Sequence, residues 1–311
     1  MKEKNRLGIV IINYNGAADT KFCLNSLGQA NLQNLEVFIE IIDNGSTLTN
    51  YHLLQESIKE LTSKSKKNLK IHVERSEDNL GFTGGNNLGI RNLLSKNVEY
   101  ILFLNNDTFI EKNMLKVLVN VLKQSQTIGI VSPKIYFAPG YEYHEARYHE
   151  KDLGKVIWYA GGLIDWRNVY FSHRGVDEVD RGQYDLAGTT DFITGCAMMI
   201  KTEVLAKTGI FDERYFLYLE DADLSMRVKT AGSVLFFEPK ALMWHKNASS
   251  SDKPGSPLHV YYQTRNRLLF GFTYATFRTR VALFRESLRM LGDDLRKQAV
   301  LDYYFGKLGK K

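Results

Sequence analysis

The chain has 311 residues, of which 44% are hydrophobic, 24% are charged and only 5 are proline, a composition that excludes a disordered, collagen-like or low-complexity protein. Its net charge of +6 lies at the C-terminal end, because residues 259–311 carry 11 Lys and Arg against 4 Asp and Glu, whereas residues 1–258 carry 30 against 31. This distribution argues against a nucleic-acid-binding body and predicts a basic C-terminal segment with an anionic partner.

We expect a cytoplasmic protein that is neither secreted nor membrane-spanning. No run of about 18 apolar residues occurs, and the first residues lead into a strand-like segment rather than a cleavable signal. The two cysteines, Cys23 and Cys196, are too few for a disulfide framework or a thiolate metal site. Both are therefore predicted to be reduced and buried.

Strand-like and helical segments alternate in the first 137 residues. Apolar, β-branched runs occupy 7–14, 35–43, 69–74 and 100–107. The alternation predicts an α/β protein with a doubly wound, mostly parallel sheet. Polar clusters follow three of these runs, at 13–16, 43–46 and 105–107. Because ligands of such sheets bind at the carboxyl ends of the strands, a site is expected there.

The regular alternation stops after Phe137. A segment rich in Tyr, His and Gly follows, from 138 to about 190, and long irregular segments of this kind tend to be lids or binding loops. A strand is then expected within 191–201 and a short helix at 202–209. Since no Gly/Ser-rich or Pro-rich linker interrupts residues 1–258, we expect them to form one domain.

The C-terminal segment, 259–311, is predicted to be a basic amphipathic helical tail. Its helical spacing places on one apolar stripe Val281, Phe284, Leu288, Leu291 and Leu295. Arg285, Arg289 and Arg296 lie off this stripe. An apolar face with a basic border suits a helix that lies among anionic lipid headgroups. Alternatively, the stripe packs on the rest of the chain or joins it to a second copy.

Two features of the first half suit nucleotide binding. Asp43 ends a strand and precedes a turn, so it serves either as a local turn acceptor or as an acceptor for a pyrimidine N–H or a ribose hydroxyl. The segment 79–87, NLGFTGGNN, matches neither the dinucleotide fingerprint nor a P-loop. Its glycine pair is predicted to open a helix and to let the backbone approach a phosphate or a sugar.

Asp107 and His245 are candidate metal ligands. Asp107 follows an apolar strand and is expected in the same crevice as Asp43, where it would hold a divalent cation together with diphosphate oxygens. It could instead cap a helix that begins near Glu111. His245 follows Trp244 at the end of a strand, and it is a ligand only if it faces Asp107; otherwise it is structural.

Three acids crowd the first turn of a predicted helix. Glu220, Asp221 and Asp223 follow the aromatic run at 215–218. Compensation of the helix dipole accounts for one or two of them. Crowded carboxylates beside apolar walls also have raised pKa values, which suits a general base.

Together these segments resemble glycosyltransferase family 2, the inverting, nucleotide-sugar-dependent enzymes with the GT-A fold. The match runs in order through IVIINYNG (9–16), IIDNGST (41–47), NLGFTGGNNLGI (79–90), LFLNNDT (102–108), TGCAMMIK (194–201), GIFDERYFLYLEDADLSMRVKTAG (209–232) and WH (244–245). The pattern is most similar to the rhamnosyltransferase-like branch of bacterial surface polysaccharide synthesis. It implies a Rossmann-like GT-A domain over 1–258, with a nucleotide-sugar-binding half (1–137) and an acceptor and catalytic half (138–258).

The resemblance implies roles for individual residues. Asp221 would be the catalytic base, with Glu220 beside it. Contacts to the donor are implied for Asn13, Tyr14, Asn15, Asp43, Asn44, Asn79, Gly81, Gly84, Asn86, Asn105, Asn106 and Asp107. Contacts to the acceptor are implied for Gly195, Cys196 and Asp223. Mg²⁺ or Mn²⁺ would be held by Asp107 and His245. The element NND at 105–107 has one carboxylate where many members have two, so the cation could arrive with the donor.

The implied reaction is a single displacement with inversion, in which Asp221 takes the proton of an acceptor hydroxyl. The donor would be a nucleoside-diphosphate sugar, with dTDP-L-rhamnose as the candidate. The acceptor would be a glycan or lipid-linked glycan at the inner face of the cell membrane, and the tail could also join copies into an oligomer. Two alternatives stay open: a sugar nucleotidyltransferase, although NYNGAAD has no basic residue, and a non-catalytic nucleotide-sugar or glycan-binding protein.

Overall fold

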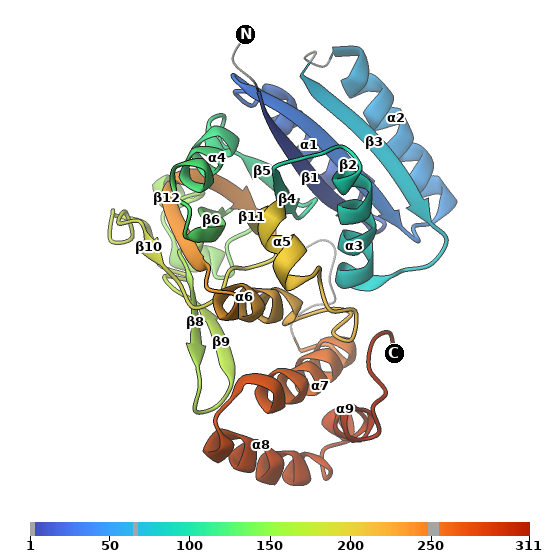
Figure 1. The fold of residues 1–311 in the computed structure, drawn as a ribbon, viewed down its shortest axis with the longest axis vertical. Helices are drawn as coiled ribbons and strands as arrows, with labels where there is room; N and C mark the ends of the chain where they lie inside the picture. Colours follow the sequence, from blue (N-terminus) through green and yellow to red (C-terminus); the bar gives the residue numbers. More distant parts are fainter. Residues whose placement is uncertain (1–3, 65–67, 248–254) are drawn as a thin grey trace.

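The computed structural model describes residues 4–64, 68–247 and 255–311, and its centre is one large sheet with helices on both faces (Figure 1). The strands run in the order β10-β12-β6-β11-β4-β1-β2-β3, with β5 paired to β12 and β7 paired to β6. A separate two-stranded sheet is formed by β8 and β9.

The bounds of the strands, in chain order, are β1 (Asn5–Asn13), β2 (Leu35–Asn44), β3 (Leu69–Ser76), β4 (Tyr100–Leu104), β5 (Thr108–Ile110), β6 (Ile128–Phe137), β7 (Ile157–Tyr159), β8 (Gly162–Asp165), β9 (Tyr170–His173), β10 (Gly188–Thr189), β11 (Ala197–Lys201) and β12 (Val234–His245). The α-helices are α1 (Ala17–Gln29), α2 (Leu48–Lys64), α3 (Gly81–Leu94), α4 (Met114–Gln124), α5 (Thr202–Thr208), α6 (Glu220–Thr230), α7 (Pro257–Tyr274), α8 (Phe277–Met290) and α9 (Asp294–Tyr304). Two 3₁₀ turns span Glu145–Arg147 and Glu150–Asp152.

The two faces of the sheet are covered by different sets of helices. One face is packed by α1, α2 and α4, with Leu118 among the buried side chains. The other face is packed by α3, α5 and α6, with Ile90 among them. Because successive residues of a strand point to opposite faces, Ile9 belongs to the first core and Val10 to the second. The predicted doubly wound α/β fold is confirmed.

The carboxyl ends of the parallel strands are aligned in space. β1 pairs in parallel with both β2 and β4, and Asn13 at the end of β1 is in register with Asp43 of β2. β11 runs antiparallel to β4, so its first residues meet the end of β4. There the Asn105 amide donates to the Cys196 carbonyl at 3.0 Å. Segments about 90 residues apart in the chain therefore meet at one edge.

The chain beyond residue 127 differs from the expectation in two respects. β6 is a full strand that the sequence pattern did not single out, and it pairs in parallel with β12. The segment 138–190, expected to be irregular, contains the short strands β7–β10, including the β8–β9 hairpin. Strands of two to four residues are too short to give a recognisable periodicity.

The C-terminal helices α7, α8 and α9 lie together beside α6 and the β8–β9 hairpin (Figure 1). The single apolar stripe predicted here is wrong, because α8 ends at Met290 and a new helix follows. Asp293 caps α9 by accepting from the Leu295 amide at 3.0 Å. Leu295 therefore lies on a different helix from Phe284 and Leu288. Among the described residues, every helix is too short or too polar to cross a bilayer.

Candidate active site

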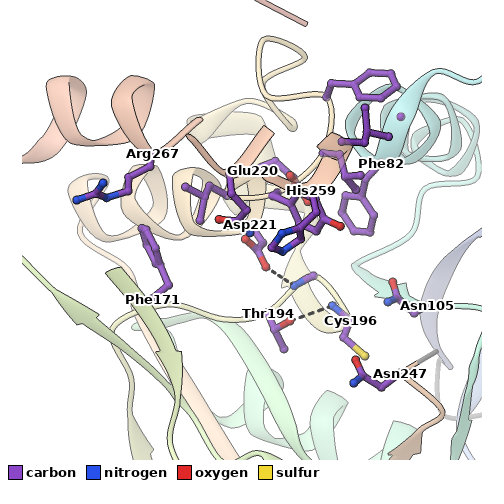
Figure 2. A pocket seen from close by; sticks show the side chains of 18 of the residues that line it. Phe82, Asn105, Phe171, Thr194, Cys196, Glu220, Asp221, Asn247, His259 and Arg267 are labelled. Atoms are coloured by element: carbon purple, nitrogen blue, oxygen red, sulfur yellow. Dashed lines mark hydrogen bonds between the residues drawn. The ribbon is translucent and has the colours of Figure 1, made fainter. Parts of the chain in front are cut away.

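A cavity of about 920 Å³ opens where the carboxyl ends of the strands face α6 and α7. Its strand-end wall contains Tyr14, Asn44, Asn79, Gly81, Phe82, Asn105, Asn106 and Asp107. Its opposite wall contains Phe216, Leu217, Tyr218, Leu219, Glu220, Asp221, His259, Gln263 and Arg267. The floor between them includes Thr194, Gly195, Cys196 and His245. Figure 2 shows Asp221 and Asn105 on opposite sides of Cys196.

A hydrogen-bonded corner joins the end of β2 to the start of α3. The Asn44 side chain donates to the Gly81 carbonyl at 3.0 Å and accepts from the Leu80 amide at 2.9 Å. Asn79 accepts from the Gly81 amide at 2.8 Å. Gly81 has φ +72°, and a Cβ there would lie 2.5 Å from Phe216, so only glycine fits without displacing the opposite wall. This corner presents backbone and amide groups, rather than charges, to the cavity.

Three of the expected donor contacts lie behind or beside this wall. Asp43 is fully buried and accepts from Asn13 at 2.8 Å, and neither residue lines the cavity. Arg75 lies 3.8 Å from the second oxygen of Asp43. Asn15 is exposed, and its side chain accepts from the Thr47 amide at 2.9 Å. The structure therefore brings Asn44, but not Asp43, to the cavity surface.

Gly84 and Asn86 also lie away from the cavity lining. Both are buried within α3, and Asn86 donates to the Phe82 carbonyl at 2.9 Å. The glycine pair was expected to open this helix, but α3 begins at Gly81, so both glycines are inside it. A Cβ at Gly85 would lie 3.1 Å from Ile12. Gly85 therefore allows close packing of α3 on the sheet, whereas a Cβ at Gly84 would meet Leu80.

Asp107 and His245 meet in the floor of the cavity. His245 Nε2 lies 3.1 Å from Asp107 Oδ1, and both side chains are buried. Burial opposes the charged imidazole, but the nearby Cys196 sulfur and the Asp107 carboxylate hold the pKa of His245 well above its usual value. Two ligands about 2.1 Å from one cation and at right angles are about 3 Å apart. The donor set and its spacing therefore fit a divalent cation that displaces the imidazole proton.

The protein supplies only part of a metal coordination sphere here. Within the residues that the structure describes, no group of three or more His, Cys, Asp or Glu side chains is placed to hold an ion. Neighbouring polar groups on the same wall are amides: Asn106 donates to Thr20 at 3.0 Å. Oxygen ligands from a bound diphosphate would have to complete the sphere.

Asp221 and Glu220 occupy the first turn of α6 but differ in exposure. Asp221 is half-buried, and its carboxylate accepts from the Gly195 amide at 2.8 Å (Figure 2). It also accepts from the Ala222 amide at 2.8 Å. Burial raises the pKa of Asp221 despite these bonds. Glu220 is only 5% exposed, and burial together with the Asp221 charge raises its pKa well above the usual value. Asp221 is thus the accessible carboxylic acid, and Glu220 is the buried one, whose protonated form is favoured by its surroundings.

Of the expected acceptor contacts, Gly195 and Cys196 line the cavity and Asp223 does not. Asp223 is buried on the far side of α6, where it accepts from Arg227 at 2.8 Å and from the Tyr274 hydroxyl at 2.7 Å. The bond from Tyr274 links α6 to α7, whereas the Arg227 bond lies within α6. Burial raises the pKa of the Cys196 thiol, although the nearby His245 opposes this shift.

Several lining residues were not named from the sequence. They are mainly aromatic side chains of the irregular segment and polar side chains of α7, namely Trp158, Tyr170, Phe171, His173, Phe192, His259, Gln263, Thr264 and Arg267. The Tyr- and His-rich composition of the irregular segment was the sequence feature that could have indicated its lining residues. No sequence feature indicated the α7 residues, because they lie on a helix whose contacts are with remote parts of the chain.

Comparisons with known proteins place this arrangement in a family. The family model for glycosyl transferase family 2 matches residues 8–209. The low-salt glycan biosynthesis hexosyltransferase Agl10 of Haloferax volcanii is 25% identical over 264 residues, which are 85% of this chain and 74% of Agl10. The dTDP-rhamnosyl transferase RfbF of Shigella flexneri is 23% identical, with coverage of 84% of this chain and 78% of RfbF.

Solved structures share the fold at lower identity. GalNAc-T7 with UDP, GalNAc and Mn²⁺ superposes with a TM-score of 0.62 at 17% identity, covering 84% of this chain, which spans about half (48%) of that structure. The mannosyltransferase PcManGT of Pyrobaculum calidifontis, in complex with GDP-Man and Mn²⁺, has a TM-score of 0.53 at 12% identity, with coverage of 97% and 74%. These likenesses concern the fold, which is the GT-A fold expected from the sequence.

Proposed function

This chain belongs to glycosyltransferase family 2, and from that premise we propose that it transfers a sugar from a nucleoside-diphosphate donor to an acceptor hydroxyl with inversion, using Asp221 as the base. The observation that carries the proposal is the placement of Asp221. It is the accessible carboxylate in the wall of a cavity whose opposite wall is made of amide and glycine residues suited to a nucleotide sugar.

We propose that the two walls have different roles in the reaction: one binds the donor and the other accepts the proton. The corner formed by Asn44, Asn79 and Gly81 is proposed to hold the nucleotide, and the 105–107 turn the diphosphate and sugar. Two backbone amides keep the Asp221 carboxylate turned into the cavity, where it would take the proton of the attacking hydroxyl. Burial and the Asp221 charge favour the protonated form of Glu220, which avoids a second negative charge close to the base.

Asp107 and His245 are proposed to hold a divalent cation together with the donor diphosphate. When bound, Mg²⁺ or Mn²⁺ would neutralise negative charge on the departing nucleoside diphosphate. The spacing of the two side chains supports this proposal, as do the Mn²⁺ ions named with GalNAc-T7 and PcManGT.

The donor sugar is proposed to be L-rhamnose, carried as dTDP-L-rhamnose. The support is the similarity to RfbF and to the N-acetylglucosaminyl-diphospho-decaprenol L-rhamnosyltransferase of Mycobacterium tuberculosis H37Rv, which is 32% identical over 74 residues, 24% of each chain. The acceptor is proposed to be a glycan or lipid-linked glycan of a cell-surface polysaccharide. Exposed Tyr170 and half-buried Phe171 on the β8–β9 hairpin offer flat apolar surfaces for a sugar ring.

Release of nucleoside diphosphate tests these assignments directly. The protein is incubated with dTDP-rhamnose, UDP-GlcNAc, UDP-galactose and GDP-mannose, each with Mg²⁺ or Mn²⁺ and an acceptor glycan. We expect dTDP from dTDP-rhamnose. Release from another sugar would correct the donor alone. Formation of nucleoside triphosphate and sugar 1-phosphate when pyrophosphate is added would indicate a nucleotidyltransferase, and binding without any release would indicate a non-catalytic protein.

Association with an anionic membrane is proposed for the outer face of α8. Phe284 and Leu288 are 46% and 49% exposed, and Phe277 at the start of the same stripe is 82% exposed. Arg285 and Arg289 border the stripe and are exposed. An exposed apolar stripe beside basic side chains is the arrangement of an interfacial helix. It would place the cavity near an acceptor confined to the cytoplasmic membrane surface.

A further inference from the structure

The loop before α6, defined here as residues 212–219, has an unfavourable backbone. Phe216, Tyr218 and Leu219 have φ values of +63°, +71° and +68°. This left-handed region is sparsely populated by bulky residues, and it persists only where the surroundings hold it. Because Leu219 directly precedes α6, its conformation sets the position and direction of the first helical turn, and hence of Asp221.

One side chain of α7 holds most of the loop. Asn266 is fully buried, and its side-chain amide lies within hydrogen-bond distance of three carbonyl oxygens. It donates to Tyr215 at 2.9 Å, to Leu217 at 2.8 Å and to Tyr218 at 2.8 Å. Carbonyl groups of a strained loop would otherwise be buried without donors, which is costly. An amide NH₂ is the compact double donor that this arrangement needs.

The neighbouring side chain fixes the orientation of that amide. Arg265 is also fully buried, and its Nε donates to Asn266 Oδ1 at 3.1 Å, which leaves the NH₂ group of Asn266 turned toward the loop. The Nη2 atom of Arg265 donates to the carbonyls of Arg214 and Tyr215, both at 3.0 Å. We call Arg265 and Asn266 the α7 clamp.

Another carbonyl of the loop, that of Phe216, is bound by the strand-end wall. The Phe216 oxygen accepts from the amides of Phe82 at 2.9 Å and Thr83 at 3.3 Å. These amides belong to the first turn of α3, beside Gly81, which lines the proposed donor corner. The loop is therefore bonded on one side to α7 and on the other to the donor side of the cavity, with Asp221 at its end.

We propose that Asn266 and Arg265 are positioning residues for sugar transfer, which keep the 212–219 loop in its left-handed conformation and so place the Asp221 carboxylate at the cavity. This inference rests on the proposed function, because it takes Asp221 as the base. It makes the basic C-terminal segment a part of the catalytic apparatus. Neither clamp residue lines the cavity, so their effect is expected on turnover rather than on donor binding.

Asn266→Asp tests the clamp, because it keeps the size of the side chain but places carboxylate oxygens against carbonyl oxygens. Misplacement of a reacting group by about 1 Å costs roughly 100-fold in rate, so we expect kcat to fall about 100-fold while the KM for the nucleotide sugar changes only a few-fold. Leu268→Ala is the matched control. Leu268 is buried in the same helix, and its apolar side chain makes no hydrogen bond to the loop.

Hydrogen exchange supplies a readout that is independent of turnover. In Asn266→Asp we expect faster exchange at the amides of Phe82, Thr83 and Leu217, which are bonded to loop carbonyls, and no such change in Leu268→Ala. Asn266→Ser, which keeps one donor, is the second variant should Asn266→Asp fold poorly, and it should lose less turnover.

Equal losses of kcat in these variants and Leu268→Ala at equal melting temperature, or unchanged exchange at the three amides, would overturn the proposal. If Asp221→Asn retains turnover, the base assignment fails, and the exchange data still decide whether the clamp holds the loop.

Discussion

The strand-end wall of the cavity and the wall made by α6, α7 and the 212–219 loop differ in charge and in the way they are held. On the strand-end wall, neutral Asn44 and Asn79 both make hydrogen bonds to the Gly81 backbone, and Asp107 is its one carboxylate among the lining residues. On the opposite wall, Glu220 and Asp221 lie side by side, and burial raises both pKa values.

This difference indicates a separation of tasks. Amide and backbone groups can bind a nucleotide sugar without changing protonation, so the strand-end wall should determine donor affinity. A half-buried carboxylate with a raised pKa can accept a proton, so the opposite wall should determine the rate of the chemical step. Substitutions on the two walls should therefore change different kinetic parameters, and the following experiments test that expectation.

The largest effect is expected for Asp221→Asn. The substitution removes the proton acceptor and preserves the shape of the side chain, so we expect kcat to fall by about two to four orders of magnitude while donor affinity stays within a few-fold. Steady-state kinetics with saturating acceptor, together with calorimetric titration of the donor, measure the two quantities. Near-full turnover in this variant would remove Asp221 from the mechanism.

Glu220→Gln is the control for that result. Because burial and the Asp221 charge raise the pKa of Glu220 well above its usual value and favour its neutral form, the amide should change little charge, and only a few-fold loss of kcat is expected. A loss as large as that of Asp221→Asn would show that the buried acid, not the accessible one, accepts the proton.

A smaller effect, on binding rather than turnover, is expected for Asp107→Ala and His245→Ala. Each substitution should weaken donor affinity in the presence of Mn²⁺ by roughly tenfold or more, because loss of a group that supports a bound metal typically costs about 10- to 100-fold in metal affinity. If both side chains hold one ion, the double variant should be about as weak as the worse single variant. Titrations with and without Mn²⁺ measure this coupling.

His72→Ala is the matched control for the metal pair. His72 lies 2.7 Å from a carboxylate oxygen of Glu40, so it is also a histidine–carboxylate pair, but it is outside the cavity lining. Its loss should leave the Mn²⁺ dependence unchanged. Strictly additive effects at Asp107 and His245, or affinity that does not depend on the cation, would mean that His245 is structural.

The strand-end wall was predictable from the sequence because its residues follow strands of a parallel sheet, and such strand ends meet at one edge. Asn105, Asn106 and Asp107 illustrate this. Asp221 was predictable for a related reason, since three acids in one helical turn are a local pattern. Asp43 shows the limit: its place at a strand end was correct, but the pattern did not reveal that Asn13 and Arg75 enclose it.

The opposite wall could not be assembled from the sequence. Asn266 and Tyr215 are 51 residues apart, and no spacing rule links an asparagine in one helix to carbonyls of a distant loop. In the sequence, Arg265 and Asn266 are two polar residues of a basic segment, whereas in the structure both are fully buried. The charge of the tail suggested an anionic partner, yet part of that charge serves the interior of the protein.

The dependence of kcat on pH tests whether the carboxylate that must be ionised for turnover is Asp221, on the wall opposite the strand ends. Only ionised Asp221 can accept a proton, and burial raises its pKa above the ordinary value of 3.8. Activity should therefore be lost as pH falls through this raised pKa, about tenfold for each further pH unit. The acid limb of log kcat against pH should have unit slope and a midpoint above 3.8, and Asp107→Ala should leave it in place. A midpoint at or below the ordinary value would contradict an ionisable base in this environment.

The smallest effects are expected for substitutions on the outer surface of the C-terminal helices, away from both walls of the cavity. Deleting residues 259–311 would not isolate membrane binding, because it would also remove Arg265 and Asn266 from the loop before α6. Single substitutions on the exposed face of α8 avoid this difficulty. Thr279, Leu283 and Ser287 form its buried face and stay unchanged.

We expect the protein to sediment with anionic vesicles at low salt, not with neutral ones, and to be released as salt is raised. Each basic side chain near such a surface contributes about 1 kcal/mol, so Arg285→Gln should weaken binding roughly fivefold. Arg181→Gln makes the same charge change at an exposed position outside α8 and should have little effect.

The apolar side of the stripe is tested in the same way. Leu288→Ser should weaken binding, while Leu186→Ser, at a side chain that is 89% exposed, should not. Since none of these side chains lines the cavity, turnover with a water-soluble acceptor should be unchanged in all four variants. Equal losses in the α8 variants and their controls would mean that net charge and general apolarity, rather than this helix face, bring the protein to the membrane.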